Sequence, residues 1–191
     1  MGNSKRLRKK YQGPAHPWQR LRIESERELK QSYGLKNKKE IWKMEAIIKE
    51  AAANIKNLIA AHSDQAEKEK KQIMTHLTSI GLIQAGAKYE DVLDLKIQNV
   101  LDRRLQTLVY RKGMARTMGQ ARQFIVHNHI LVGGRSITMP SYIVAAEEEA
   151  AITFAPSSEL AKADHPERTP ITRKVKSRPE RVPESRKGRR K

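Results

Sequence analysis

The chain has 191 residues, of which 39 are Lys or Arg and 21 are Asp or Glu, so its formal net charge is +18. An excess of this size is typical of proteins that bind polyanions such as nucleic acids. The absence of cysteine excludes disulfides, thiolate metal sites and cysteine nucleophiles, and no apolar run approaches the roughly 18 residues that a membrane span needs.

Residues 1–19 are predicted to form a basic, extended N-terminal arm. No apolar segment follows its first basic residues, so we expect no secretory signal and a cytoplasmic location. The prolines within residues 13–18 favour extended backbone, which would pack on RNA or on the folded domain. We interpret the arm as ordering against a phosphate backbone, and a tail that only aids solubility is the alternative. Its candidate RNA-binding residues are Lys5, Arg6, Arg8, Lys9 and Lys10.

Residues 20–98 are predicted to form a helical domain. A short charged helix is expected from about residue 24 to residue 32, and a longer one from about 38 to 61, where apolar residues recur every three or four positions. A third helix begins near Asp64, with Glu67 completing a capping box, and ends at Gly81. The facing apolar stripes favour an intramolecular bundle over a coiled coil, because the longest stripe covers fewer than about three heptads.

Residues 99–155 are predicted to form a compact helix-helix-hairpin module. A helix is expected over 101–110, and a second begins where Thr117 and Gln120 make a capping box. Apolar residues on both sides of Gly133–Gly134 predict a hairpin with a primed turn. Residues 142–144 and 151–154 are candidates for further short strands. The predicted fold class is therefore α+β, with an N-terminal helical bundle, the module and extended basic tails.

Residues 156–191 are predicted to form a basic tail with no fold of its own. Five prolines interrupt it, so neither a helical nor a strand period survives. We expect the tail to be mobile in the free protein and to become ordered along RNA, and free disorder is the alternative. Its candidate RNA-binding residues are Arg186, Lys187, Arg189, Arg190 and Lys191.

The module resembles the S-four RNA-binding domain, which is named after the fourth small-subunit ribosomal protein. The resemblance rests on Leu101, Asp102, Arg104, Leu105, Val109, Tyr110, Arg111, Ala115, Thr117, Ala121, Arg122, Phe124 and Ile125. Residues 33–42 and 95–107 also resemble the archaeal and eukaryotic branch of that ribosomal family. Many bacterial members hold zinc through a cysteine cluster near the N-terminus, and this chain has no cysteine, so no metal and no cofactor are expected.

The basic residues of the module are its candidate RNA-binding face. Residues 99–135 hold 7 basic and 1 acidic residue, and Glu147–Glu149 follow as a separate negative corner in a turn. Arginine forks bind phosphates bidentately, and neutral donors fix orientation. Helical spacing predicts that Arg104 and Arg111 flank the apolar stripe, so reversing both charges should weaken binding and spare the fold. The candidates are Arg103, Arg104, Arg111, Lys112, Arg116, Thr117, Gln120, Arg122, Gln123, Asn128 and Arg135.

No catalytic residues are predicted. His127 and His129 lie two positions apart with no carboxylate nearby in the sequence, so a polar helix end is favoured over a metal site. The resemblance implies a structural constituent of the small ribosomal subunit. Such a protein binds a 5′-domain junction of small-subunit ribosomal RNA, nucleates assembly and supports translational accuracy. Its implied partners are that RNA, neighbouring small-subunit proteins and mRNA where it enters the subunit. The alternatives are a stand-alone RNA-binding factor acting on ribosomes and a fragment of an RNA-modifying enzyme.

Overall fold

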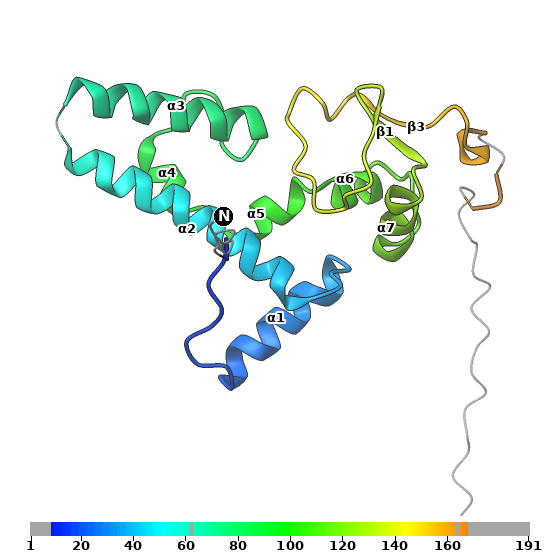
Figure 1. Ribbon diagram of the computed structural model, residues 1–191, viewed down its shortest axis with the longest axis horizontal. Helices are drawn as coiled ribbons and strands as arrows, with labels where there is room; N and C mark the ends of the chain where they lie inside the picture. Colours follow the sequence, from blue (N-terminus) through cyan, green and yellow to red (C-terminus); the bar gives the residue numbers. More distant parts are fainter. Residues whose placement is uncertain (1–8, 62, 163–164, 168–191) are drawn as a thin grey trace, which may run out of the picture.

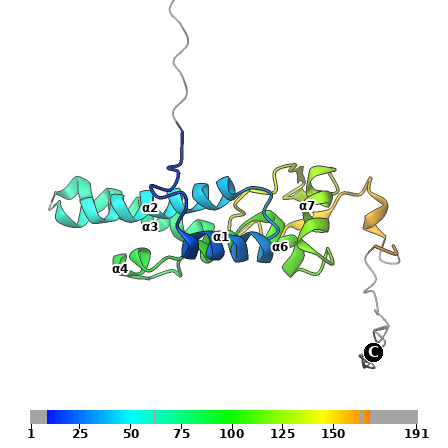
Figure 2. The ribbon, with the colours of Figure 1, turned by 90° about the horizontal axis from the view of Figure 1, so that it is seen from below.

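The computed structural model describes residues 9–61, 63–162 and 165–167 of the chain. It confirms the predicted α+β class, because helices make up the N-terminal part and a three-stranded antiparallel sheet lies in the C-terminal part. The molecule is elongated, with α2 and α3 at one end and α7 and the sheet toward the other (Figure 1). Viewed from below it is also thin (Figure 2). None of the helices in the described residues is both long enough and apolar enough to cross a membrane.

Helices α2 and α3 lie close to their predicted positions, whereas α1 begins four residues before the predicted start at about residue 24. Helix α1 spans Arg20–Ser32, α2 spans Lys38–Ala60 and α3 spans Asp64–Ile80. The cap of α3 is one residue earlier than predicted, because the Ser63 hydroxyl accepts a hydrogen bond from the Ala66 amide at 3.2 Å. Gly81 ends the helix in the left-handed conformation, with φ at 77°, which a residue without a Cβ adopts at little cost.

Helix α2 is the common support of the N-terminal part. Near its start, Ile41 and Met44 are buried in a small core with Leu35 and with α5. Near its end, Ile55 is buried in a different core with α3 and α4. The predicted bundle is therefore open, since α1 and α3 pack at opposite ends of α2 and share no single core (Figure 1).

Helices α4, α5 and α6 are short, and the last two correct a sequence prediction. They span Tyr89–Leu93, Ile97–Asp102 and Leu105–Arg111. A single helix was expected over 101–110, whereas the backbone is extended at Arg104 between α5 and α6.

Backbone hydrogen bonds to a distant segment cause this break. The Leu105 amide donates to the Tyr142 carbonyl at 2.8 Å, and the Val144 amide donates to the Arg103 carbonyl at 3.0 Å. Arg104 and Ile143 thereby form an isolated antiparallel bridge. Residues 142–144 were a candidate strand, and this bridge is the strand-like pairing that they make.

The second half of the module follows the sequence closely. Helix α7 spans Met118–Val126, and β1 and β2 span Ile130–Val132 and Arg135–Ser136 as an antiparallel hairpin. Gly133 and Gly134 have φ values of 56° and 77°, as the predicted primed turn requires. Strand β3, Ile152–Phe154, pairs antiparallel with the other edge of β1.

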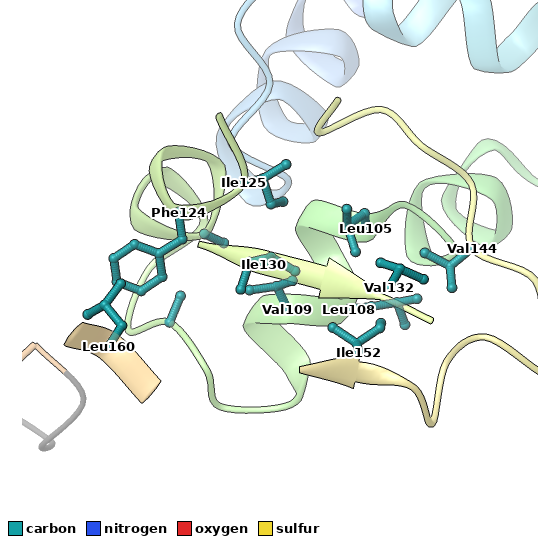
Figure 3. Close-up of a cluster of buried hydrophobic side chains, with 12 residues drawn as sticks. Leu105, Leu108, Val109, Phe124, Ile125, Ile130, Val132, Val144, Ile152 and Leu160 are labelled. Carbon is teal, nitrogen blue, oxygen red and sulfur yellow. The ribbon is translucent and has the colours of Figure 1, made fainter. Parts of the chain in front are cut away.

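The core of the module lies between α6, α7 and the sheet (Figure 3). Leu105 and Val109 from α6 and Ile125 from α7 are completely buried there. Burial of such side chains stabilises a fold by about 1.5–3 kcal/mol each. The other buried members are Leu108, Ala115, Ala121, Phe124, Ile130, Val132, Val144, Ile152 and Leu160.

The presence of Leu160 in this core corrects the prediction for the C-terminal tail. Residues 156–161 have a fold, because they end in a 3-10 helix, η1, over Glu159–Ala161. Leu160 is only 6% exposed and belongs to the module core. The Ser158 hydroxyl accepts from the Leu160 amide at 3.2 Å and fixes the turn. Residues 168–191 lie outside the described part of the chain.

Candidate nucleic-acid interface

Arg111 is a cation held in place at the end of α6. Its guanidinium lies 2.6 Å from the Asp102 carboxylate, and its side chain is 53% exposed. Asp102 also accepts a hydrogen bond from the Tyr33 hydroxyl at 2.9 Å. Burial, together with this hydrogen bond and the negative charge of Asp102, raises the pKa of Tyr33 to about 12. Tyr33 therefore stays protonated and keeps Asp102 oriented toward Arg111.

The connection from α6 to α7, with the residues that flank it, holds five of the eleven residues predicted for the module. Thr117 is the N-cap of α7 and accepts from the Gln120 amide at 3.1 Å. Gln120 in turn accepts from the Arg116 amide at 2.7 Å through its side-chain oxygen. The Lys112 ammonium donates to the Glu149 carbonyl at one end of this connection. Residues 111–120 thus present cations and neutral donors from a backbone that local hydrogen bonds hold fixed.

The described end of the tail meets the same connection. The Gln120 side-chain amide donates to the Glu167 carboxylate at 2.6 Å. The Arg116 guanidinium donates to the Pro166 carbonyl. Pro166 and Glu167 therefore lie next to the start of α7.

The remaining predicted residues of the module are spread over α7 and the hairpin. Arg122 is 28% exposed, and Gln123, Asn128 and Arg135 are exposed. Asn128 adopts a φ of 62° after the end of α7, a conformation that asparagine tolerates better than most residues. In the arm, Lys9 and Lys10 are exposed.

Two arginines expected on this surface are instead part of the interior, which corrects the sequence prediction. Arg104 is only 1% exposed, and its guanidinium lies 2.5 Å from the Glu40 carboxylate. Arg103 is 14% exposed and bonds the Glu149 carboxylate at 2.6 Å and the Val144 carbonyl at 3.0 Å. The break between α5 and α6 turns these side chains away from the positions that a continuous helix would give them.

Glu40, at the start of α2, joins the N-terminal helices to the module. Besides Arg104, it faces Arg122 at 3.4 Å and accepts from the Lys36 amide at 3.2 Å. Burial alone would raise the pKa of Glu40, but the hydrogen bond and charge of Arg104, with the charge of Arg122, hold it below the ordinary value. The carboxylate is therefore ionised at neutral pH and is matched by two arginines.

The acidic residues at 147–149 are not a free negative corner, and this prediction is also wrong in part. Glu149 pairs with Arg103, as described above, and Glu148 accepts from the Tyr142 hydroxyl at 2.9 Å. That hydrogen bond, with burial and the charge of Glu148, raises the pKa of Tyr142. Only Glu147 of the three is exposed, so these acids mainly hold the 142–149 loop in place.

The two histidines after α7 contact neighbouring side chains of the module. The His129 ring meets the Ser158 hydroxyl at 2.8 Å and packs edge-on against Phe124. The ring centroids of His127 and His129 lie 6.4 Å apart. His129 thus connects the end of α7 to the C-terminal segment.

Sequence reasoning missed basic residues at the start of α2. Lys36 and Lys39 are exposed and lie four residues and one residue before Glu40, which contacts Arg122 of α7. They therefore extend the positive surface of the module onto the N-terminal helices. The run of three lysines within residues 36–39 was visible in the sequence, but nothing local indicated that it meets α7.

Several predicted residues of the arm and the tail lie outside the described part of the chain. They are Lys5, Arg6, Arg8, Arg186, Lys187, Arg189, Arg190 and Lys191.

Comparison with known proteins agrees with this geometry. Residues 103–149, which include the break, α6, α7 and the hairpin, match the family model of the S4 domain. The chain is an S4-domain protein.

Over nearly its whole length the chain also resembles archaeal proteins named small ribosomal subunit protein uS4. It is 51% identical to that of Methanococcus aeolicus over 170 residues, which cover 88% of this chain and 96% of the relative. It is 47% identical to that of Methanothermobacter thermautotrophicus, with 85% and 95% covered, and 47% identical to that of Nanoarchaeum equitans, with 85% and 92% covered. The chain therefore belongs to the uS4 family of small ribosomal subunit proteins, and the resemblance to the archaeal branch is confirmed.

Proposed function

We propose that this protein is a structural constituent of the small ribosomal subunit and binds small-subunit ribosomal RNA directly. The observation that carries the proposal is the charge balance of the S4 module. Residues 99–135 hold 7 basic residues and 1 acidic residue, and that acid, Asp102, orients the exposed Arg111. Glu149 and Glu40, from outside this segment, pair with Arg103, Arg104 and Arg122, whereas Lys112 and Arg135 are exposed and form no ion pair within the described residues. The surface therefore keeps a positive excess on a rigid support. The protein acts by binding and is not an enzyme.

The proposed RNA-binding surface runs from the α6–α7 connection to the hairpin. Structured RNA presents phosphates and 2′-hydroxyls across a shallow minor groove, so a rigid array of donors recognises it by shape. Arg111 offers a planar fork for phosphate oxygens, and neutral side chains such as Gln123 fix orientation. The described residues that we assign to this surface are Arg111, Lys112, Arg116, Thr117, Gln120, Arg122, Gln123, Asn128 and Arg135, with Lys9 and Lys10 from the arm.

The two arginines at the α5–α6 break have a different role in this proposal. Arg103 and Arg104 hold the α5–α6 break and the Glu40 contact, so they position the surface and do not touch RNA. The basic residues outside the described part of the chain would neutralise phosphates that the folded part does not reach, which makes binding depend on salt through counterion release.

Family membership supports the finer parts of the proposal. We infer that the RNA target is a junction in the 5′ domain of small-subunit ribosomal RNA and that binding there nucleates assembly. The partners are then neighbouring small-subunit proteins and mRNA where it enters the subunit, with a contribution to translational accuracy. The protein acts in the cytoplasm as part of the ribosome. The match to uS4 relatives over 88% of the chain favours this reading over a stand-alone factor or a piece of a modifying enzyme.

The test is backbone footprinting of full-length protein on protein-free small-subunit ribosomal RNA. We expect the protein to protect one junction. Changing both Arg111 and Arg135 to Glu should weaken binding by roughly 150- to 20,000-fold, since each lost hydrogen bond to a charged group contributes about 1.5–3 kcal/mol. A matched control changes Lys56 and Lys68, which are exposed on α2 and α3, to Glu in the same way. This control should weaken binding less than about tenfold. Equal losses in the two double variants would mean that only overall charge matters.

A further inference from the structure

The indole of Trp18 is the most exposed large apolar side chain in the described residues, with 91% of its surface accessible. It lies just before α1, which begins at the lower tip of the coloured ribbon, away from α7 and the sheet (Figure 1). Leu21, three residues further on, is 76% exposed. The other tryptophan, Trp42, is partly buried, and its indole N–H donates to Glu26 at 2.9 Å.

The backbone that carries Trp18 is held rigid. The Arg22 guanidinium donates to the carbonyls of His16 and Pro17, each at 2.9 Å, and so fixes the two residues before the indole. Arg22 also lies 3.4 Å from the Glu26 carboxylate. Glu26 is itself only 6% exposed. The exposed ring is therefore presented from an anchored turn, and it is not the side chain of a loose end.

The anchor is charged at neutral pH. Burial alone would raise the pKa of Glu26, but hydrogen bonds from Trp42 and Lys38, with the charges of Lys38 and Arg22, hold it below the ordinary value. Because the Lys38 ammonium also lies 2.9 Å from Glu26, the turn is tied to the first residue of α2. Little conformational freedom remains to be lost when the indole meets a partner.

The charge around Trp18 indicates what kind of partner it fits. Residues 9–22 contain four basic residues and no acidic residue. The first acid beyond this stretch, Glu24, pairs with Arg20 at 2.7 Å in an exposed contact, and such a contact contributes little and exchanges easily for a phosphate. A flat apolar ring close in sequence to an exposed arginine, here Arg20, is the kind of arrangement by which proteins stack on unpaired nucleic-acid bases.

We propose that Trp18 stacks on an unpaired base of small-subunit ribosomal RNA, with Arg20 contacting a neighbouring phosphate. This inference rests on the proposed function and adds to it a second RNA contact, away from the S4 module. The module recognises RNA by backbone shape, whereas the indole selects a place where a base is free to leave its helix. Leu21 borders the ring and is not required for stacking.

The test compares full-length Trp18→Ala and Trp18→Phe on protein-free small-subunit ribosomal RNA. Base–aromatic stacking predicts that Trp18→Ala binds roughly 5- to 100-fold more weakly, while Trp18→Phe stays within about threefold of the wild type. The salt dependence of binding should be the same in all three, because no phosphate contact is removed. Leu21→Ala is the matched control and should bind like the wild type. Circular dichroism of each variant should be unchanged, since neither side chain is buried.

Two further readouts identify the contact. RNA should quench the tryptophan emission of the wild type more strongly than that of Trp18→Phe, which keeps only the partly buried Trp42. One base should change its chemical reactivity with the wild type and with Trp18→Phe, but not with Trp18→Ala.

Each contrary result overturns a distinct statement. If the wild type binds the RNA specifically and Trp18→Ala binds equally well, the stacking proposal is wrong and the proposed function stands. Trp18→Ala could also bind protein-free RNA normally but enter subunits that contain other proteins less efficiently. In that case the indole packs on a protein neighbour, and the stacking proposal is again wrong. If the wild type shows no specific binding, both the proposed function and the stacking proposal are wrong.

Discussion

Replacing Arg104 separates a structural arginine from an RNA-binding one. The side chain is 1% exposed and meets Glu40 at 2.5 Å. Breaking a buried ion pair by removing one partner typically costs 3–5 kcal/mol. Glu40 would keep Arg122 and the Lys36 amide, so we expect Arg104→Met to lower the free energy of unfolding by about 2–3 kcal/mol. Arg104→Glu adds repulsion between the new, buried carboxylate and that of Glu40, which is 18% exposed, and should cost about 4–5 kcal/mol.

Arg111→Glu is the matched control. Arg111 also pairs with a carboxylate, but its side chain is 53% exposed, and exposed pairs contribute about 0–1 kcal/mol. We therefore expect Arg111→Glu to keep the fold and to lose RNA affinity. The double reversal of Arg104 and Arg111 should unfold the module, which is the opposite of what the helical spacing of the sequence predicts.

Urea denaturation followed by circular dichroism measures both effects on the free protein. The wild type and Arg111→Glu should unfold at similar midpoints, and Arg104→Glu at a much lower one. Since a domain of this kind is stable by roughly 5–15 kcal/mol, a loss of about 4–5 kcal/mol is readily resolved. A cost below about 1 kcal/mol for Arg104→Glu would refute the reasoning, because it would mean that Arg104 leaves the interior easily.

The other predictions concern packing, pH and salt. Leu105→Asp should abolish cooperative unfolding of the module, since Leu105 is completely buried and an unpaired charge there is very costly. Gly34→Ala should cost more than about 2 kcal/mol in the same denaturation assay, because its φ is +57° and a Cβ would lie 2.7 Å from the Met118 Cβ. Because folding lowers the pKa of Glu40, its contribution to stability should be fully present above the unfolded-state pKa of about 4.3. That contribution should be lost as the pH falls through the lower pKa of the folded state. In urea melts, Glu40→Gln should therefore lose less stability between neutral and acidic pH than the wild type does. Finally, if about 8 phosphates are neutralised, log K should fall with log salt with a slope of about −6 to −7, and filter binding giving a slope shallower than about −2 would contradict the electrostatic account.

Elements whose signals are local could be predicted from the sequence. Helix α2 has an unbroken apolar stripe, α3 ends at a glycine and the hairpin turns at a glycine pair, and all three lie within a residue or two of their expected positions. Helix α4 was missed because its five residues are too few for a periodic pattern to emerge.

Elements decided by distant contacts could not be predicted. The break between α5 and α6 depends on backbone bonds to residues 142–144, and no residue near the break breaks helices by itself. Leu160 lies in a segment rich in proline, and its burial depends on packing against the module core.

The candidate site follows the same rule. Arg104 and Arg111 have the same side chain and similar positions on the expected helix, so spacing alone assigns both to the surface. What separates them is Glu40, which lies 64 residues before Arg104 in the sequence. Trp18 was visible in the sequence as part of an extended segment, but only its exposure and the Arg22 anchor indicate that it faces outward.

Helix α2 sets the distance between the two parts of the protein that pack at its ends. Its 23 residues span about 34 Å at 1.5 Å per residue, and the separate cores at its two ends attach α3 and α4 at one end and α1, α5 and the module at the other. Any two partners bound at these ends are held at a separation and a rotation that the number of helical turns determines. Inserting four residues in the middle of α2 would lengthen the spacing by about 6 Å and rotate one end against the other by about 40°. The spacing between the two cores is thus itself encoded by the length of one helix.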